Sequence, residues 1–341
     1  MAKAKVAING FGRIGRLFFR HAWQNDDLEI VAVNDLGSVE NLAYLLKYDS
    51  VYRQFPGEVG FDGNDLMVDG KRIKVLQVKD PAQLPWKDMD IDIAVESTGF
   101  FATFEKASAH LTAGAKHVVI TAPAKDEERP DAKTILLGVN DDQMKVCKVT
   151  SNGSCTTNAT SPVMAIMAET IGIEKAALST VHAYTSTQSL TDSPVHGNDF
   201  RKGRAAAQNT APSTTGAAIS VARALPELQG KFDGVAIRVP VVSGSLTDIT
   251  FLAKRKTTVE EVNDIFRKAA QEPRWKGIMK ATDDQLVSSD IIGEPYGAII
   301  DLRLTKVIDG DFVKVFSWYD NEAGYVSTLL GHVLKAAENL Q

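Results

Sequence analysis

A glycine-rich segment near the start of the chain constrains the fold more than any other feature of the sequence. The apolar run Lys5–Asn9 predicts a buried strand, Gly10-Phe11-Gly12-Arg13-Ile14-Gly15 follows it, and a helical pattern begins at Arg16. A second apolar strand ends at Asp35, about 20 residues beyond Gly15. Glycine turns alone are common, but this order of strand, turn, helix, strand and acidic residue is typical of a dinucleotide-binding Rossmann unit.

Each residue of this segment has a physical task in such a unit. Gly10 allows the tight turn, Gly12 lets a pyrophosphate approach the backbone, and Gly15 lets the helix pack on the strand. Asp35 would accept hydrogen bonds from the adenosine ribose hydroxyls and repel a 2′-phosphate. The segment therefore predicts NAD as cofactor, with these contacts: Gly10, Gly12, Arg13, Ile14, Gly15 and Asp35.

Further strands alternate with helical stretches up to about residue 150. Ile91–Glu96 and His117–Ile120 are apolar strands, with a helical pattern at Phe104–Gly114 between them. Ligands of open parallel sheets bind at the carboxyl ends of the strands. Thr98 and Thr121 follow two such ends and are therefore expected to contact the cofactor.

Cys155 lies in a polar turn, residues 151–158, between a predicted strand at Val146–Val149 and a helix with one buried face. A thiol at a helix N-terminus has its pKa lowered by the helix dipole and becomes a nucleophile. The alternative is a structural cysteine packed as a small hydrophobe. The polar neighbours Ser154 and Thr156 favour the nucleophile.

After this helix the pattern changes to longer alternating strands with interleaved helices, which predicts a mixed, largely antiparallel sheet. The fold class is therefore α/β, a Rossmann domain followed by an α+β domain. We expect the NAD-binding domain at 1–151, a catalytic and substrate-binding domain at 152–320, and a closing helix at 321–341. The segment 186–209 shows no periodicity, and so long a loop is usually functional.

The composition excludes several classes of protein. The 341 residues are 44% hydrophobic and 24% charged, and the net charge of −5 has no basic block. We therefore expect neither nucleic-acid nor membrane binding. Two cysteines and the lack of a secretory signal pattern predict a cytoplasmic protein without disulfides. No cysteine or histidine pair has the spacing of a metal site.

His182 is the candidate partner of Cys155, because its strand ends in a polar stretch just before the long loop. A lone strand histidine is more often structural, and a Cys–His pair also serves cysteine proteases. The Rossmann half favours a dehydrogenase over a protease. Arg238 at a strand end, and Thr215-Gly216 before a helix, suggest binding sites for phosphate groups.

Three motifs, in order and spacing, resemble the glyceraldehyde-3-phosphate dehydrogenase family. They are Ser154-Cys155-Thr156-Thr157-Asn158, Val181-His182-Ala183 and Trp318-Tyr319-Asp320-Asn321-Glu322. The resemblance runs from Val6 to about Lys335. It implies NAD-dependent oxidation of glyceraldehyde 3-phosphate in glycolysis, through a Cys155 thiohemiacetal and thioester that inorganic phosphate splits to 1,3-bisphosphoglycerate. It also implies a homotetramer and a last helix that packs on the first domain.

The resemblance carries further roles to matching positions of this sequence. Cys155 and His182 would be catalytic, and Asn321 would orient the nicotinamide, with Tyr325 nearby. Arg238 and Thr185 would hold the phosphate of the substrate. The attacking inorganic phosphate would be held by Thr215, Gly216 and either Arg201 or Arg204. Ser154 and Thr156 are expected at the substrate as well.

Some positions depart from the family pattern. Lys79 stands where an arginine often contacts the adenine, and Ser193 stands where a bulkier residue often helps to exclude NADP. Two alternatives stay open, an erythrose-4-phosphate dehydrogenase of the same family and a non-catalytic dinucleotide-sensing protein. Against them stand the intact run from Thr214 to Ala218 and the presence of the cysteine, histidine and asparagine.

Overall fold

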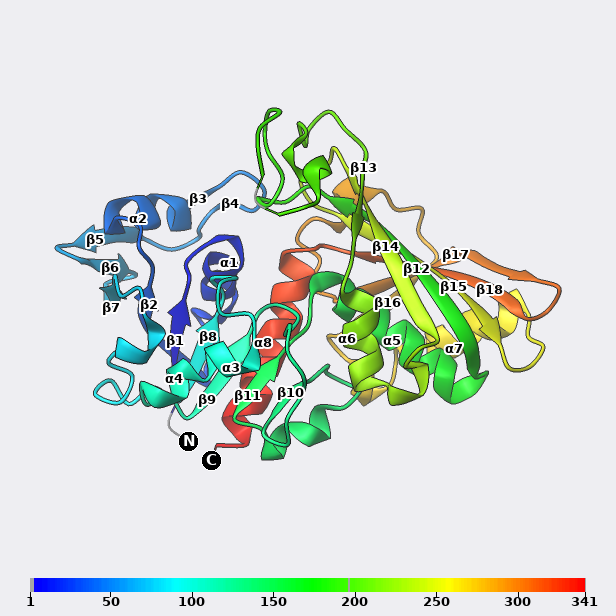
Figure 1. Ribbon diagram of the computed structural model, residues 1–341, viewed down its shortest axis with the longest axis horizontal. Helices are drawn as coiled ribbons and strands as arrows, with labels where there is room; N and C mark the ends of the chain where they lie inside the picture. Colours follow the sequence, from blue (N-terminus) through cyan, green and yellow to red (C-terminus); the bar gives the residue numbers. More distant parts are fainter. Residues whose placement is uncertain (1–2, 196, 341) are drawn as a thin grey trace. The chain divides into compact units, whose positions relative to one another are not determined.

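The computed structural model describes residues 3–195 and 197–340 (Figure 1). The contacts between its elements divide the chain into two compact units. The first runs to Gly153 and takes in the chain from Leu329 onward, and the second runs from Ser154 to Thr328. Each unit is built on a β-sheet of its own.

The sheet of the first unit has the strand order β10-β11-β9-β8-β1-β2-β7-β6-β5. Neighbours from β10 to β7 run parallel, and the β7-β6 and β6-β5 pairs are antiparallel. Its strands are β1 (Ala4–Asn9), β2 (Leu28–Asn34), β5 (Val59–Asp62), β6 (Asp65–Val68), β7 (Lys71–Leu76), β8 (Ile93–Glu96), β9 (His117–Ile120), β10 (Ala132–Thr134) and β11 (Val149–Ser151). Both β8 and β9 are buried along their whole length, as expected of apolar parallel strands covered on both faces.

The order outward from β1 places β2 and β7 on one side and β8, β9 and β11 on the other, which is the doubly wound Rossmann arrangement. The predicted fold class is thus confirmed for this half of the chain. The remaining elements of the unit are α1 (Arg13–Ala22), α2 (Val39–Lys47), the short ribbon β3 (Tyr48–Asp49) and β4 (Arg53–Gln54), α3 (Phe104–Ala107), α4 (Ala109–Thr112) and most of α8 (Ala323–Glu338).

Two predicted elements of the first unit were wrong in detail. The strand expected at Val146–Val149 lies at β11, Val149–Ser151, and Val146 ends a 3₁₀ segment with its side chain exposed. The polar end of this strand is buried and hydrogen-bonded, since the Ser151 hydroxyl donates to Ala122 O at 2.7 Å, and a sequence pattern does not show such pairing. The helix expected at Phe104–Gly114 is split at Ser108, whose hydroxyl donates to Phe104 O.

A buried relay holds α8 in the first unit. Thr150 Oγ1 of β11 lies 3.0 Å from His117 Nε2 of β9 and 2.7 Å from His332 Nε2 of α8. Burial lowers the pKa of His117 to about 4 and that of His332 to about 3. Both imidazoles are therefore neutral at physiological pH.

The sheet of the second unit has the order β13-β14-β12-β15-β18-β17-β16. The β12-β14 and β16-β17 pairs are parallel and the others antiparallel, which confirms the mixed, largely antiparallel sheet. Its strands are β12 (Ile173–Ala183), β13 (Ala211–Thr214), β14 (Phe232–Val239), β15 (Ser245–Ala253), β16 (Met279–Thr282), β17 (Ala298–Ile308) and β18 (Phe312–Tyr319). The helices α5 (Cys155–Thr170), α6 (Ala217–Ala224) and α7 (Val259–Ala269) pack on one face of it (Figure 1).

Helix α5 is more deeply buried than its sequence pattern predicted. Its residues from Thr156 to Met167 are all buried, not only those on one face. Ser154 caps the helix, because its hydroxyl accepts from Thr157 N–H at 3.1 Å while the Thr157 hydroxyl accepts from Ser154 N–H. This reciprocal capping box fixes where the helix begins, and Cys155 is its first residue.

Candidate active site

The glycine turn after β1 has the geometry that its sequence predicts. Gly10 has φ +94°, and a Cβ there would lie 2.6 Å from Thr98 N. A Cβ on Gly15 would lie 2.1 Å from Gly10 O, so only glycine lets α1 approach the strand this closely. A Cβ on Gly12 would meet nothing within 4 Å, which leaves the space over the start of α1 open. Helix α1 begins at Arg13, so its first N–H groups face a site suited to an anion.

Asp35 follows β2 and is held by the backbone around it. Its carboxylate accepts from Phe11 N–H at 2.8 Å and from Gly37 N–H at 2.9 Å. The first of these bonds ties the acidic residue to the glycine turn. The side chain of Arg13 pairs with Asp49 at 2.5 Å, so the helix start offers its backbone rather than this guanidinium.

A cavity of about 490 Å³ opens beside these residues, all within the first unit. Of the expected cofactor contacts, Gly10, Gly12, Asp35, Lys79 and Thr98 line it. Thr121 does not line it, and its hydroxyl donates to Glu96 O at 3.1 Å.

Sequence reasoning missed several residues of the cavity wall, namely Asn9, Asn34, Leu36, Val78, Ser97, Phe100 and Phe101. The sequence could have indicated the two asparagines, because they are the last residues of β1 and β2. Each is a polar side chain at the end of an otherwise largely apolar strand. Phe100 is 82% exposed and Leu36 63% exposed, although both are large apolar side chains. Apolar and aromatic side chains that line a cavity beside a few polar groups are typical of a small-molecule or cofactor site.

In the second unit, the strand β12 carries His182 toward the start of α5. Along β12 the buried residues Leu178, Thr180 and His182 alternate with more exposed ones, so they share the face that the helices cover. Cys155 Sγ lies 3.4 Å from His182 Nε2. The structure therefore brings together the two residues predicted to be catalytic.

The other side of His182 faces a cation. His182 Nδ1 lies 2.7 Å from Ala183 O and 2.6 Å from Arg238 Nη1, and Arg238 also donates to Ala183 O at 3.0 Å. The ring packs edge-on against Tyr319, whose hydroxyl bonds Thr156 Oγ1 and Thr180 Oγ1 at 2.9 Å each. These contacts fix the plane of the imidazole.

The protonation of the pair differs from the sequence prediction. Burial raises the pKa of the Cys155 thiol, against the lowering expected from the helix N-terminus, although Arg238 and the hydrogen bonds of Thr156 act in the expected direction. Burial and the nearby Arg238 lower the pKa of His182 to about 3. The site at rest holds a thiol beside a neutral imidazole, so His182 can act as a base.

Of the residues predicted to bind phosphate groups, some share one cavity and others do not. Arg238 and Arg201 line one small cavity of about 70 Å³, together with Thr187 and Thr214. Arg204 is not part of its wall and pairs with Asp192 at 2.8 Å, while Arg201 pairs with Asp199 at 2.7 Å.

The remaining expected ligands have local partners. The Thr185 hydroxyl bonds Thr187 Oγ1 at 2.9 Å. Thr215 Oγ1 accepts from Ala217 N–H at 3.2 Å, and Gly216 caps α6 without a side chain. The start of α6 thus offers backbone N–H groups, as predicted for a phosphate site.

Asn321 follows β18 and is buried, and its amide is already oriented. Its Oδ1 accepts from the hydroxyls of Ser245 at 2.8 Å and Ser243 at 3.4 Å. Tyr325 is buried in the first turn of α8. Ser154 and Thr156 are engaged in the helix cap and the Tyr319 network, so the structure shows them as supports of Cys155.

In the part of the chain that the structure describes, no group of three or more histidine, cysteine, aspartate or glutamate residues is arranged to hold a metal ion. Within the same residues, no helix is long and apolar enough to cross a membrane.

A Rossmann unit with a nucleotide-sized cavity, joined to a unit with a thiol–imidazole pair and arginines, defines a nicotinamide-dependent dehydrogenase that works through a cysteine. Two family models match the chain. They describe the glyceraldehyde 3-phosphate dehydrogenase NAD binding domain, over residues 4–104, and C-terminal domain, over residues 154–321. The chain belongs to the glyceraldehyde-3-phosphate dehydrogenase family.

Individual relatives agree over nearly their full length. The glyceraldehyde-3-phosphate dehydrogenase of Thermotoga maritima is 52% identical over 325 residues, which cover 94% of this chain and 96% of the relative. That of Streptomyces coelicolor is 48% identical over 329 residues, 96% of each chain. That of Zymomonas mobilis is 45% identical over 339 residues, 98% of this chain and 99% of the relative.

Proposed function

We propose that this chain oxidises glyceraldehyde 3-phosphate and joins the product to inorganic phosphate, with NAD as cofactor, as the glycolytic enzyme does. The observation that carries the proposal is the 3.4 Å approach of Cys155 Sγ to His182 Nε2 in a chain of this family. Cys155 and His182 are its catalytic residues.

The chemistry begins with the neutral pair. Sulfur bonds to the aldehyde carbon while the thiol proton passes to His182 Nε2, which returns it to the aldehyde oxygen to give the thiohemiacetal. In the tautomer with its proton on Nδ1, His182 donates that proton to Ala183 O, and Arg238 donates to the same carbonyl oxygen rather than to Nδ1. The Nε2 lone pair then faces Sγ. His182 later takes the thiohemiacetal hydroxyl proton, so the group acts in turn as base and acid.

NAD, when bound, supplies the hydride acceptor that turns the thiohemiacetal into a thioester. The glycine turn, the N–H groups of Arg13 and Ile14, Asp35, Lys79 and Thr98 would hold it, with Thr121, Asn321 and Tyr325 as further expected contacts. The open space over Gly12 and the cavity beside Asp35 fit a dinucleotide. The carboxylate of Asp35 opposes a 2′-phosphate, so NAD is preferred to NADP, while Ser193 weakens that exclusion.

Two phosphate groups need two anion sites. Arg238 and Thr185 would hold the phosphate of the substrate. The attacking inorganic phosphate would bind at Thr215 and Gly216 with a loop arginine. That arginine would be Arg201 or Arg204, and Arg201 lines a cavity together with Thr214, the residue before Thr215.

Hydrolysis of the thioester would require a base that activates water. Within the segment 137–173, Glu169 is the only glutamate, and it lies about four turns along α5 from Cys155. Both of its carboxylate oxygens pair with Arg274 at 2.8 Å. Phosphate is therefore the acyl acceptor.

The proposal predicts a strict need for inorganic phosphate or arsenate. Rapid mixing of enzyme, aldehyde and NAD without either anion should give about one NADH per active site, followed by a stall, because the thioester accumulates. Thr215→Val should weaken the phosphate dependence and leave the burst intact, whereas Arg238→Gln should chiefly raise the KM of the aldehyde. Sustained turnover in phosphate-free buffer would contradict the mechanism, and turnover of erythrose 4-phosphate at higher kcat/KM would favour the alternative substrate.

We also propose a cytoplasmic homotetramer that binds neither nucleic acid nor membranes. The support is the net charge of −5 without a basic block, and an apolar face on the second unit. The sheet face opposite the helices exposes Val181, Val235, Leu304 and Phe312, each 37% to 51% accessible. The long polar loop, residues 186–209, would lie against a neighbouring subunit.

A further inference from the structure

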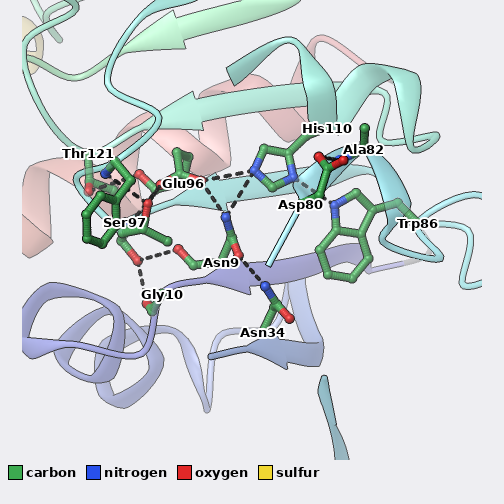
Figure 2. Close-up of polar contacts among 12 residues, drawn as sticks. Asn9, Gly10, Asn34, Asp80, Ala82, Trp86, Glu96, Ser97, His110 and Thr121 are labelled. Carbon is green, nitrogen blue, oxygen red and sulfur yellow. Dashed lines mark hydrogen bonds and ion pairs between the residues drawn. The ribbon is translucent and has the colours of Figure 1, made fainter. Parts of the chain in front are cut away.

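A buried chain of side-chain hydrogen bonds crosses the first unit beneath the nucleotide cavity. It joins Asn34 of β2, Asn9 of β1, Glu96 of β8, His110 of α4 and Trp86, as Figure 2 shows. All five side chains are at least 95% buried. Such a network is stable only when every donor meets an acceptor.

At the Asn34 end of this network, the direction of the hydrogen bonds is fixed. Val78 N–H can only donate, and it does so to Asn34 Oδ1 at 2.9 Å. Asn34 Nδ2 therefore donates to Asn9 Oδ1 at 2.7 Å. Asn9 Nδ2 in turn donates to Glu96 Oε2 at 2.5 Å.

The other end runs toward the same atom. The indole N–H of Trp86 can only donate, and it lies 2.9 Å from His110 Nδ1, which must accept. The proton of the neutral imidazole is then on Nε2, and it points to Glu96 Oε2 at 3.0 Å. Both ends of the network thus deliver a proton donor to one carboxylate oxygen.

The second oxygen of Glu96 organises the turn after β8. Glu96 Oε1 accepts from Thr98 N–H at 2.8 Å and from the Thr98 hydroxyl. That hydroxyl accepts in turn from Phe100 N–H at 3.1 Å. The cavity wall includes Asn9, Asn34, Thr98 and Phe100, so one carboxylate holds residues from three strand ends around it.

We propose that Glu96 is a positioning residue for the cofactor: as an acceptor at both oxygens, it sets the wall of the cavity against which the dinucleotide binds. The inference rests on the proposed assignment of this cavity to NAD. Glu96 itself does not line the cavity and acts through Thr98, Asn9 and Asn34.

The role requires two acceptor oxygens and not merely a side chain of this shape. Glutamine has nearly the same size, but its NH₂ group would face the donors of either Asn9 and His110 or Thr98. A buried donor without an acceptor costs about 1–3 kcal/mol. Glu96→Gln should therefore distort the wall even though it fills the same volume.

The test measures NAD binding to the full-length protein by calorimetry, apart from turnover. Glu96→Gln should raise the Kd of NAD about 10-fold, which corresponds to about 1.4 kcal/mol, with the KM values of aldehyde and phosphate unchanged. The matched control is Glu128→Gln in the same unit. Its carboxylate accepts Thr134 N–H at 2.8 Å, which an amide oxygen can also accept. An unchanged Kd for Glu96→Gln would overturn the proposal.

A double variant tests the inferred direction of the hydrogen bond between His110 and Glu96. Trp86→Phe removes the donor that fixes the His110 tautomer, so the ring can shift its proton to Nδ1 and accept from the glutamine amide. NAD should then bind more tightly to Trp86→Phe/Glu96→Gln than to Glu96→Gln alone. A double variant weakened by the sum of both single effects would contradict this direction.

If Glu96→Gln does not fold, Trp86→Phe alone still tests the positioning role of Glu96. It should raise the Kd of NAD severalfold, whereas Trp275→Phe, a change of another buried tryptophan in the second unit, should not. Equal affinities for both variants and the parent would refute the positioning role. A parent protein that binds NAD but does not turn over the aldehyde would refute only the proposed function.

Discussion

At the scale of single residues, the site depends on what surrounds each group more than on its identity. The chain has two cysteines, and burial raises the pKa of both. Cys147 reaches about 11 and donates to Gln143 O at 3.3 Å, whereas Cys155 lies beside the Nε2 atom of His182. The thiol of Cys155 thus has a base within reach of its proton, whereas that of Cys147 donates to a carbonyl oxygen.

This contrast predicts selective alkylation. At pH 7 iodoacetamide should modify Cys155 at least about 10²-fold faster than Cys147, since a positioned base contributes about that much or more. His182→Asn should remove most of the difference, and Cys155→Ser should abolish turnover. Mass spectrometry of peptides after timed labelling measures both rates. Equal rates in the parent protein would show that the imidazole does not activate the thiol.

Sequence patterns pointed to Cys155, His182, Asp35 and Thr98 as candidates because each lies at or near the end of a recognisable element. They did not reveal Asn9, Asn34 or Glu96, whose partners lie on other strands. The pKa of Cys155 was also mispredicted, because the helix N-terminus is visible in a sequence but the depth of burial is not. Chemistry carried by a local pattern was thus predictable, and chemistry set by tertiary packing was not.

At the scale of elements, the relay from β9 through β11 to α8 makes the first unit sensitive to acid. His117 and His332 have folded-state pKa values of about 4 and about 3, below the unfolded value of about 6.5. A lowered histidine pKa favours the neutral form, so its stabilisation is complete above about pH 6.5 and is lost as the pH falls toward the folded values.

The expected loss is about 2 kcal/mol for each histidine between pH 6.5 and pH 5. His332→Gln keeps a polar group beside Thr150 but cannot take up the proton, so its unfolding midpoint should depend less on pH across this window. Ser327→Ala on the same helix is the control, because it changes no titrating group and should leave the pH dependence unchanged. The measurement is thermal unfolding at several pH values, followed by circular dichroism, of the parent protein and both variants. Parallel curves for parent and His332→Gln would exclude the relay as the cause.

Elements differed in how well the sequence predicted them. The largely apolar, fully buried β8 and β9 and the alternating β15 were recognisable from their sequence patterns. Strand β11 was misplaced because Thr150 and Ser151 are polar yet fully buried. Thr150 finds its partners in β9 and α8, and Ser151 finds its partner at Ala122, all of them far away in the sequence.

At the scale of the whole molecule, the apolar face of the second unit predicts assembly. Light scattering at micromolar concentration should give a mass about four times that of the 37.0 kDa chain. Val235→Lys places a charge on that face and should shift the protein to smaller species. Val146→Lys, at an exposed position of the first unit, should not. A monomeric parent protein would overturn the proposed assembly.

The first unit draws on both ends of the chain, and this has a consequence for synthesis on the ribosome. The strands up to Ser151 emerge early, but His332 and the rest of α8 follow only after the whole second unit has been made. At 5–20 residues per second, the nascent sheet waits on the order of ten seconds for the helix that covers it. During that time Thr150 of β11 lacks its His332 partner, so a chaperone has the most exposed surface to protect while the chain is still unfinished.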